Sequence, residues 1–302
     1  MYNNTSLNIL ISYAYMNKNQ PLINNIIRLA SLGKMNFMID SGAFTKHNAL
    51  FNTSFINVEQ YCEFLHKYGE YAEKYVMLDV VGNEKQSKIN YEKMVADGLK
   101  PMFVATMFDK DYEYMRQTLS VNKNMCVAGG VTTKSDWMTK RFQQVFIQTN
   151  KKARLHGLGY VTYPKMYQLP LASVDSSSWK VSAQKYGTLC GFSRNKFVHY
   201  GNAYEYYKQG KSISNDLIDN LIHIGVTKSM FLNEQNHRGT NSIDTALNTR
   251  AFLLYQKYSK KQSLDLFLAI SSNIDLLKIE YTYENLYNFS YEKFLKEFKN
   301  EN

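Results

Sequence analysis

Short apolar runs alternate with longer amphipathic stretches over the first two-thirds of this 302-residue chain. The apolar runs predict strands at residues 8–15, 36–40, 75–80, 101–106, 125–128, 154–158, 171–175 and 188–192. The stretches between them predict helices at residues 21–33, 57–69, 86–97, 110–119 and 134–148. Strands and helices that alternate in this way are typical of parallel strands joined by right-handed crossovers.

These strands predict an α/β fold, a (β/α)8 TIM-like barrel with additional C-terminal helices, and an open doubly wound sheet is the alternative. After residue 201 the pattern becomes helical, in the segments 202–209, 214–224, 240–259, 262–273 and 283–298. We therefore expect a barrel core with a catalytic rim at residues 1–201, and a C-terminal helical region at residues 202–302 that packs on the barrel.

Acidic residues and glycines follow the predicted strands. Asp40 ends the segment NFMID, Asp79 ends YVMLD and Asp175 ends LASVD. Glycines follow two further strands, at Gly129, Gly130, Gly157 and Gly159. In a parallel barrel all these positions lie on the rim where barrel enzymes place their sites. A helix N-cap explains one such aspartate equally well, and a tight turn explains one such glycine, but their combination on one rim favours a site.

Two kinds of chemistry need several carboxylates at one place. In glycosidic bond cleavage, one carboxylate attacks the anomeric carbon and a second group manages the proton on the leaving group. Metal binding is the other, and it calls for additional oxygen or imidazole ligands. His47 and His156 lie near the predicted rim, but no closely spaced histidine pair accompanies them. The residues therefore favour glycosidic chemistry, and we expect no metal site.

Charge and cysteine content indicate which partner, which cysteine chemistry and which compartment to expect. The net charge of +10 and pI of about 9.2 favour a polyanionic partner such as nucleic acid, with a solvated basic surface as the alternative. The three cysteines, Cys62, Cys126 and Cys190, stand far apart, so neither a structural zinc site nor a disulfide scaffold is expected. The chain shows no signal-peptide pattern and no long apolar span, so we expect a cytoplasmic protein without a membrane contact.

The segment DSGAFT at residues 40–45 resembles the DSGGFQ signature of the tRNA-guanine transglycosylase superfamily. Further segments follow in the same order: MLD at 77–79, VAGGV at 127–131, HGLG at 156–159 and SVDSSSW at 173–179. The Asp–Ser–Ser–Ser–Trp stretch resembles most the phage and bacterial branch that inserts 7-deazaguanine bases into DNA. The resemblance covers about residues 8–200.

The resemblance implies a role for each matching residue. Asp175 would be the nucleophile that attacks C1′ of the target nucleoside, and Asp40 the acid/base residue that exchanges a proton with the departing and incoming bases. Ser41 and Gly42 would bind the base, and Asp79 would read its N1–H and 2-amino edge. The remaining base-binding positions would be Gly129, Gly130, Gly157 and Gly159.

The implied reaction replaces guanine in DNA by a preQ0-like 7-deazaguanine base, through a covalent Asp–deoxyribosyl intermediate. A duplex target would have to extrude its base, or the target would be single-stranded. Trp179 would stack on a base or sugar, while Arg194 and Lys196, beside His199 and Tyr200, would hold phosphate. The structural alternative is that Trp179 is a core residue and that the two cations belong to an ordinary surface.

Two departures from the superfamily pattern bear on the substrate. The tRNA enzymes carry a C-terminal zinc motif, whereas no cysteine follows Cys190, so the resemblance implies no zinc cofactor here. The family's Gln–Gly pair is also missing, and Thr106 or Met107 would stand in its place. DNA is therefore the expected partner, a tRNA-guanine transglycosylase of the queuine or preQ1 type is one alternative, and a non-catalytic barrel that binds nucleic acid is another. The need for a helper protein stays open.

Overall fold

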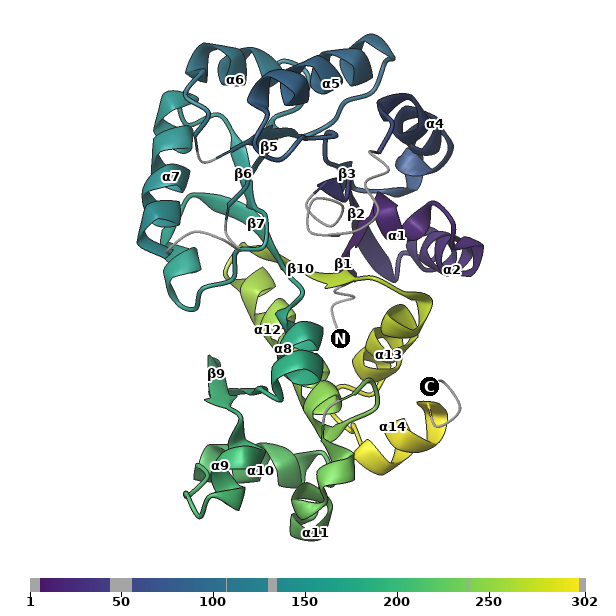
Figure 1. Cartoon of the computed structure of the whole chain (residues 1–302), viewed down its shortest axis with the longest axis vertical. Coiled ribbons are helices and arrows are strands. Elements are labelled where there is room, and N and C mark those ends of the chain that lie inside the picture. The colour runs from purple at the N-terminus through teal and green to yellow at the C-terminus, as the bar shows by residue number, and fades with distance from the viewer. Residues whose placement is uncertain (1–5, 44–55, 107, 130–134, 238, 299–302) are drawn as a thin grey trace. The chain divides into compact units, whose positions relative to one another are not determined.

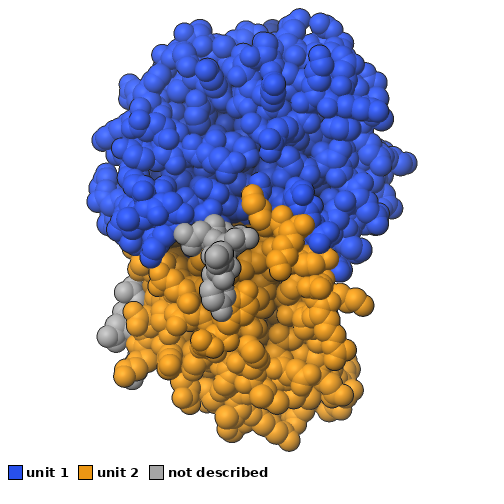
Figure 2. Space-filling view, turned by 180° about the vertical axis from the view of Figure 1, so that it is seen from behind, with its two compact units in different colours: residues 1–176, 262–272 blue, residues 177–261, 273–302 orange. Residues whose placement is uncertain are grey.

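The computed structural model describes residues 6–43, 56–106, 108–129, 135–237 and 239–298. The chain forms two compact units, coloured separately in Figure 2. The first, here called the barrel unit, comprises Met1–Ser176 and Gln262–Ser272. The second, here called the inserted unit, comprises Ser177–Lys261 and Asn273–Asn302. The units therefore divide after residue 176 rather than after residue 201, and the chain returns to the barrel unit near its end.

Parallel strands form the sheet of the barrel unit (Figure 1). They are β1 (Leu7–Ser12), β2 (Met35–Asp40), β3 (Lys74–Tyr75), β4 (Phe103–Ala105), β5 (Asn124–Val127), β6 (Arg154–Gly157), β7 (Leu171–Ser176) and β10 (Asp265–Ile270). Their order is β3-β2-β1-β10-β7-β6-β5-β4. A parallel bridge between Val76 and Met102 joins the two ends of this order and closes the circle. The prediction of an α/β TIM-like barrel with extra helices is confirmed.

The eighth barrel strand is not the one that the sequence predicted. The segment expected at residues 188–192 is β8 (Leu189–Ser193), which pairs antiparallel with β9 (Lys196–Gly201) in a separate sheet. β10 takes the eighth place, between β7 and β1, although the segment 262–273 was expected to be helical. A short apolar run such as LDLFLAI fits a buried strand and a buried helix equally well, because periodicity does not separate the two.

Helices surround the strands of the barrel unit on the outside (Figure 1). They are α1 (Tyr13–Met16), α2 (Gln20–Ser31), α4 (Val58–Tyr68), α5 (Glu84–Ala96), α6 (Tyr112–Thr118) and α7 (Ser135–Gln148), with short 3-10 turns η1 (Gly69–Tyr71) and η2 (Lys165–Gln168). Five of them begin after a capping side chain that accepts a backbone N–H bond: Ser12, Asn19, Asn57, Asn83 and Asp111. Asn83 rather than Asp79 therefore caps α5, which leaves the Asp79 carboxylate free for another role.

The inserted unit is mainly helical. It contains α8 (Ser178–Tyr186), the β8–β9 hairpin, α9 (Ala203–Lys208), α10 (Asn215–His223), α11 (Lys228–Leu232), the 3-10 turn η3 (Glu234–Asn236), α12 (Ile243–Lys261), α13 (Asn273–Glu284) and α14 (Tyr291–Phe298). Its core joins the apolar faces of α10, α12 and α14, with Leu221, Leu247 and Phe294 each no more than 5% exposed. No helix in the described part of the chain is both long enough and apolar enough to cross a bilayer.

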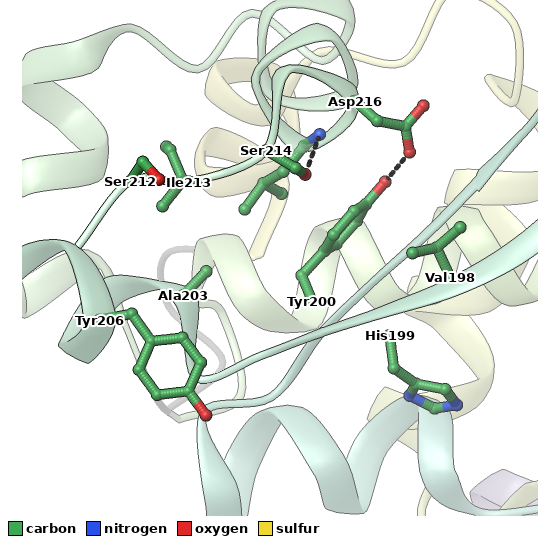
Figure 3. A pocket seen from close by; sticks show the side chains of 10 residues that line it. Val198, His199, Tyr200, Ala203, Tyr206, Ser212, Ile213, Ser214 and Asp216 are labelled. Atoms are coloured by element: carbon green, nitrogen blue, oxygen red, sulfur yellow. Dashed lines mark hydrogen bonds between the residues drawn. The ribbon is translucent and has the colours of Figure 1, made fainter.

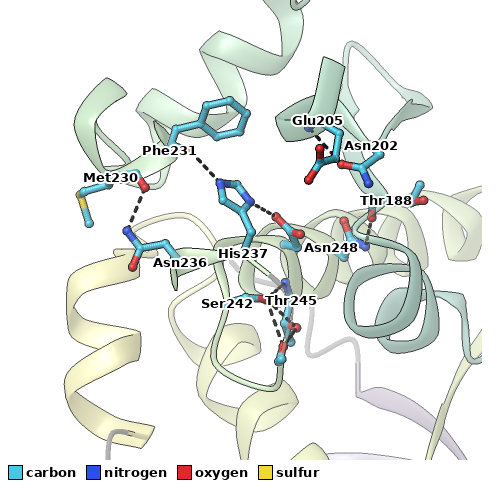
Figure 4. Close-up of polar contacts among 12 residues, drawn as sticks. Thr188, Asn202, Glu205, Met230, Phe231, Asn236, His237, Ser242, Thr245 and Asn248 are labelled. Atoms are coloured by element: carbon cyan, nitrogen blue, oxygen red, sulfur yellow. Dashed lines mark hydrogen bonds and ion pairs between the residues drawn. The ribbon is translucent and has the colours of Figure 1, made fainter. Parts of the chain in front are cut away.

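Buried polar side chains tie the central helix α12 to its neighbours (Figure 4). Asn248 accepts a hydrogen bond from the Cys190 backbone N–H at 2.7 Å and donates one to the Thr188 carbonyl at 2.9 Å. His237 lies 2.7 Å from Asp244 through Nδ1 and 2.6 Å from the Phe231 carbonyl through Nε2. Both ring nitrogens of His237 thus face an oxygen atom.

Candidate functional site

The three strand-end aspartates lie at the carboxyl rim of the barrel. Asp40 is the last residue of β2, Asp79 follows shortly after the bridge at Val76, and Asp175 is the fifth residue of β7. Because all strands of the sheet run parallel, these positions meet at one end of the barrel.

The three carboxylates are near enough for their charges to act on a common set of groups. The pKa of Asp40 is raised from 3.8 to about 7, first by burial and then by the negative charges of Asp79 and Asp175. The same three carboxylates raise the pKa of the Cys126 thiol, after the larger effect of burial. Since Cys126 lies on β5 and is fully buried, the three acids gather around the barrel interior.

Asp40 and Asp79 are connected through the residue that follows Asp40. Ser41, which is fully buried, donates a hydrogen bond from Oγ to Asp79 Oδ1 at 3.2 Å. Burial raises the pKa of Asp79, and this hydrogen bond partly offsets the rise. Asp40 in turn accepts the Gly42 backbone N–H at 3.0 Å through Oδ2. The Ser41–Gly42 step therefore holds two neighbouring carboxyl groups, and burial raises the pKa of both.

Gly42 is required at its position by the backbone. Its φ of +84° lies in the left-handed region, and an added Cβ would stand 2.3 Å from Ser12 Oγ and 2.7 Å from Ala14 Cβ. No side chain fits this space without displacing β1 or α1. The glycine thus allows the turn that points its N–H at Asp40, and its role in the site is to shape that turn.

Asp175 is held by two donors on one of its oxygens. Oδ1 accepts the Gly159 backbone N–H at 2.8 Å and lies 3.2 Å from His156 Nε2. The other ring nitrogen of His156 lies 2.8 Å from Ser173 Oγ. Asp175 is 7% exposed and His156 is 1% exposed. One oxygen of this nearly enclosed side chain is therefore fixed by two contacts.

The predicted glycines have different roles in the structure. Gly159, with a φ of +62°, directs its N–H toward Asp175, and Gly129 has a φ of +116°. Gly157 is instead required by packing, because an added Cβ would come within 3.1 Å of Phe142 and 3.2 Å of Tyr160. Gly130 and Met107 lie outside the described residues.

The residues expected to contact nucleic acid lie in the inserted unit. Trp179 on α8 is 1% exposed, so its ring is a core residue and the expected stacking role is corrected. Arg194 and Lys196 are exposed at the tip of the β8–β9 hairpin, where Arg194 and Asn195 have φ values of 47° and 62°. Arg194 therefore lies in a tight two-residue turn and Lys196 begins the strand that follows it, both open to solvent.

A pocket of about 460 Å³ lies beside this hairpin within the inserted unit (Figure 3). Tyr200 donates its hydroxyl hydrogen to Asp216, and Ser193 Oγ donates to the same carboxylate at 2.5 Å. These two hydrogen bonds lower the pKa of Asp216. Because both carboxylate oxygens are occupied, Asp216 joins β8 and β9 to α10 rather than offering a free group to a ligand.

Among the residues that the structure describes, no group of three or more His, Cys, Asp or Glu side chains is arranged to hold a metal ion. Cys62, Cys126 and Cys190 are each buried and unpaired with one another.

His156 and Ser173 are the site residues that the strand-end pattern missed. The alternation of β7 places Ser173 and Asp175 on one face, and His156 stands opposite Ser173 in the parallel register. This pairing of adjacent strands is the signal that would have found them. Comparison with known families finds no matching family model, and comparison with curated proteins finds no match either.

Proposed function

We propose that this protein is a base-exchanging glycosyltransferase that replaces guanine in DNA by a 7-deazaguanine base. One observation carries the proposal: the pKa of Asp40 is raised to about 7, in part by the charge of Asp175, and Asp175 is a carboxylate held by two donors on the same barrel rim. Two carboxyl groups in different surroundings at one rim are suited to divide the roles of proton donor and nucleophile. The resemblance of the segments around both residues to the transglycosylases supports the same assignment.

In the first half-reaction, a carboxylate oxygen of Asp175 attacks C1′ of the target nucleoside. The bond from C1′ to the base nitrogen breaks, and its electron pair leaves with the guanine. The carboxylic acid of Asp40 supplies the proton that neutralises the departing base, because a group with a pKa of about 7 is substantially protonated near neutral pH. The product is an ester between Asp175 and the sugar.

In the second half-reaction, the Asp40 carboxylate takes the proton from the ring nitrogen of the incoming base. That nitrogen forms the new bond to C1′, and the Asp175 ester bond breaks so that its electron pair returns to the carboxylate. The two halves mirror each other, so the proton and the electron pairs balance and Asp40 is ready for another cycle.

Base recognition is assigned to Asp79, Ser41 and the glycine turns. A carboxyl group at the position of Asp79 presents acceptor oxygens to the N1–H and 2-amino edge of guanine, and Ser41 fixes the orientation of that group. Gly129 offers a close approach of backbone to the flat base, as Gly130 is expected to do.

DNA is the proposed carrier of the base. The net charge of +10 favours a polyanion, and the exposed pair Arg194 and Lys196 suits phosphate contacts. Since Asp175 is nearly enclosed, the target nucleotide must leave the base stack or be single-stranded before C1′ reaches it.

The test is an exchange assay with a radiolabelled base. Wild-type protein is incubated with labelled guanine or a labelled 7-deazaguanine and either DNA or unmodified tRNA, beside the Asp175→Asn variant. The proposal expects label in DNA from the wild type alone. Label in tRNA alone would show that the protein exchanges bases in tRNA and not in DNA. Nucleic-acid binding with no exchange in either polymer would overturn the proposal and favour a non-catalytic binding barrel.

A further inference from the structure

The contact between His156 and Asp175 is built by strand register. His156 on β6 pairs with Ser173 on β7, and Asp175 lies two residues further along β7 on the same face. All three side chains are buried, at 1%, 2% and 7% exposure. The His156 ring also meets the Phe267 ring edge-on, with centroids 6.1 Å apart. The imidazole is thereby fixed on three sides.

The partners of His156 determine where its ring proton lies. An ionised Asp175 carboxylate only accepts hydrogen bonds, so Nε2 at 3.2 Å must carry a proton. In the neutral ring, Nδ1 then accepts the Ser173 hydroxyl hydrogen at 2.8 Å. Ser173 thus selects the tautomer that donates to Asp175, as second-layer partners of functional histidines commonly do.

The two oxygens of Asp175 are therefore inequivalent. Oδ1 receives both donors, from His156 and from the Gly159 backbone, whereas no hydrogen bond within the described residues reaches Oδ2. We propose that His156, oriented by Ser173, is a positioning residue that occupies Oδ1 and leaves Oδ2 to form the bond to C1′. This inference rests on the proposed function and deepens it by assigning the reacting atom and its support.

The same donor has a second consequence, in the breakdown of the intermediate. In the ester Oδ2 is bonded to C1′ and Oδ1 is a neutral carbonyl oxygen, so its hydrogen bonds are weaker than those to a carboxylate. The bond from His156 strengthens as the ester breaks and negative charge returns to Asp175. Removing the His156 donor is therefore expected to slow the breakdown of the Asp175 ester more than its formation. The Gly159 backbone N–H still supports formation.

The test compares His156→Leu, which has no donor, with His156→Gln, whose amide N–H takes the place of Nε2–H. Single-turnover measurements follow formation and breakdown of the covalent intermediate separately. We expect His156→Leu to accumulate intermediate and to break it down about tenfold to a hundredfold more slowly, with KM for the incoming base unchanged. His156→Gln should recover most of the breakdown rate, and Ser173→Ala should fall between the two.

A matched control uses the exposed histidine that also contacts an aspartate. His66 lies 2.8 Å from Asp97 with half of each side chain exposed, so His66→Leu should keep wild-type rates. Wild-type breakdown in His156→Leu would overturn the inference. Equal loss of both steps in His156→Leu and His156→Gln, together with a lower melting temperature, would overturn it as well, because it would indicate a structural role only.

A second readout does not depend on activity. Nitrogen-15 NMR of the wild-type protein with labelled histidine reports which ring nitrogen of His156 carries hydrogen. The inference expects a proton on Nε2 and an unprotonated Nδ1 that shifts in Ser173→Ala. If the wild type exchanged no base, the proposed function would fail. A proton on Nδ1 alone, in a wild type that does exchange base, would overturn the positioning role of His156 while leaving the proposed function standing, even where His156→Leu did not fold.

Discussion

Ser41 donates a hydrogen bond to Asp79 across 3.2 Å, and this bond connects the end of β2 to the segment that follows β3. Because Ser41 directly follows Asp40, the same backbone step brings the two carboxyl groups together. The pKa of Asp40 is raised by burial and by the charges of Asp79 and Asp175, whereas at Asp79 the Ser41 hydroxyl counteracts part of the effect of burial. The two neighbouring acids thus have different environments.

Asp40 makes the folded state less stable at high pH. Its pKa is about 7 in the folded protein and 3.8 without the fold, so between these values the native state binds more protons than the unfolded state. Stability therefore falls as pH rises through this window, by at most ~4 kcal/mol for this group. Asp40→Asn, which carries no charge, should be more stable than wild type at pH 8 and should lose that advantage toward pH 4.

Urea unfolding of both proteins at a series of pH values checks this prediction. Asp175→Asn is the comparison, since it removes a neighbouring charge but leaves Asp40 in place. A stability difference between Asp40→Asn and wild type that does not change between pH 4 and pH 8 would show that Asp40 titrates near its ordinary pKa.

Gly42→Ala tests the turn that holds the Asp40 carboxyl group. The added methyl group would meet Ser12 Oγ at 2.3 Å, at a φ of +84°. We expect a loss of ~3 kcal/mol or more in the free energy of unfolding. Gly33→Ala is the matched control, because Gly33 has a similar φ of +66° but open space around it, and it should cost only ~1 kcal/mol. Equal losses in urea titrations would mean that backbone strain, not the close approach, sets the requirement at Gly42.

The buried pair of His237 and Asp244 should stabilise the inserted unit. Asp244→Asn removes the charge opposite a ring whose other nitrogen faces the Phe231 carbonyl, and we expect a loss of ~3 kcal/mol. Glu234→Gln breaks an exposed pair with Lys208 at 3.5 Å and should leave the free energy of unfolding without a measurable change. Hydrogen exchange of α12 amides reports the effect on this unit directly, and unchanged protection in Asp244→Asn would argue against a role for the pair.

The hairpin cations should contribute to DNA binding if DNA is the substrate carrier. Asparagine suits the positive φ of residue 194. Arg194→Asn and Lys196→Gln should each reduce the slope of log DNA affinity against log salt concentration by ~0.7 to ~0.9. Lys228→Gln removes an exposed charge elsewhere in the same unit. If Lys228→Gln lowered the slope as much as the hairpin variants, net charge rather than the hairpin would account for binding.

The sequence predicted most of the barrel but not how it closes. The first seven strands lie where the apolar runs predicted them. The eighth could not be identified, since LDLFLAI in β10 has no helical or strand period of its own and follows the long helix α12. The hairpin partner of β8 was missed because Arg194 and Asn195 form its turn, where the sequence has none of the usual glycine signals.

The sequence indicated the acidic residues of the candidate site but not the contacts that support them. Asp40 and Asp175 end strands, and the alternation of a strand determines which way they face. In the sequence His156 is a histidine without a nearby partner, because its contact with Asp175 depends on which strands are neighbours and in what register they pair. Trp179 was assigned to a surface role, since a tryptophan next to polar serines gives no sign that its ring is enclosed.

The proposed mechanism requires Asp175 to become covalently bonded to the sugar. To detect this bond, the protein is incubated with a guanine-containing DNA strand and denatured without adding an incoming base, and the adduct is mapped by peptide mass spectrometry. We expect a sugar–DNA adduct on the peptide that contains Asp175, absent from Asp175→Asn, whose exchange rate should fall by about a thousandfold or more while its melting temperature is retained. An adduct on another residue, or exchange by Asp175→Asn at the wild-type rate, would contradict the proposed mechanism.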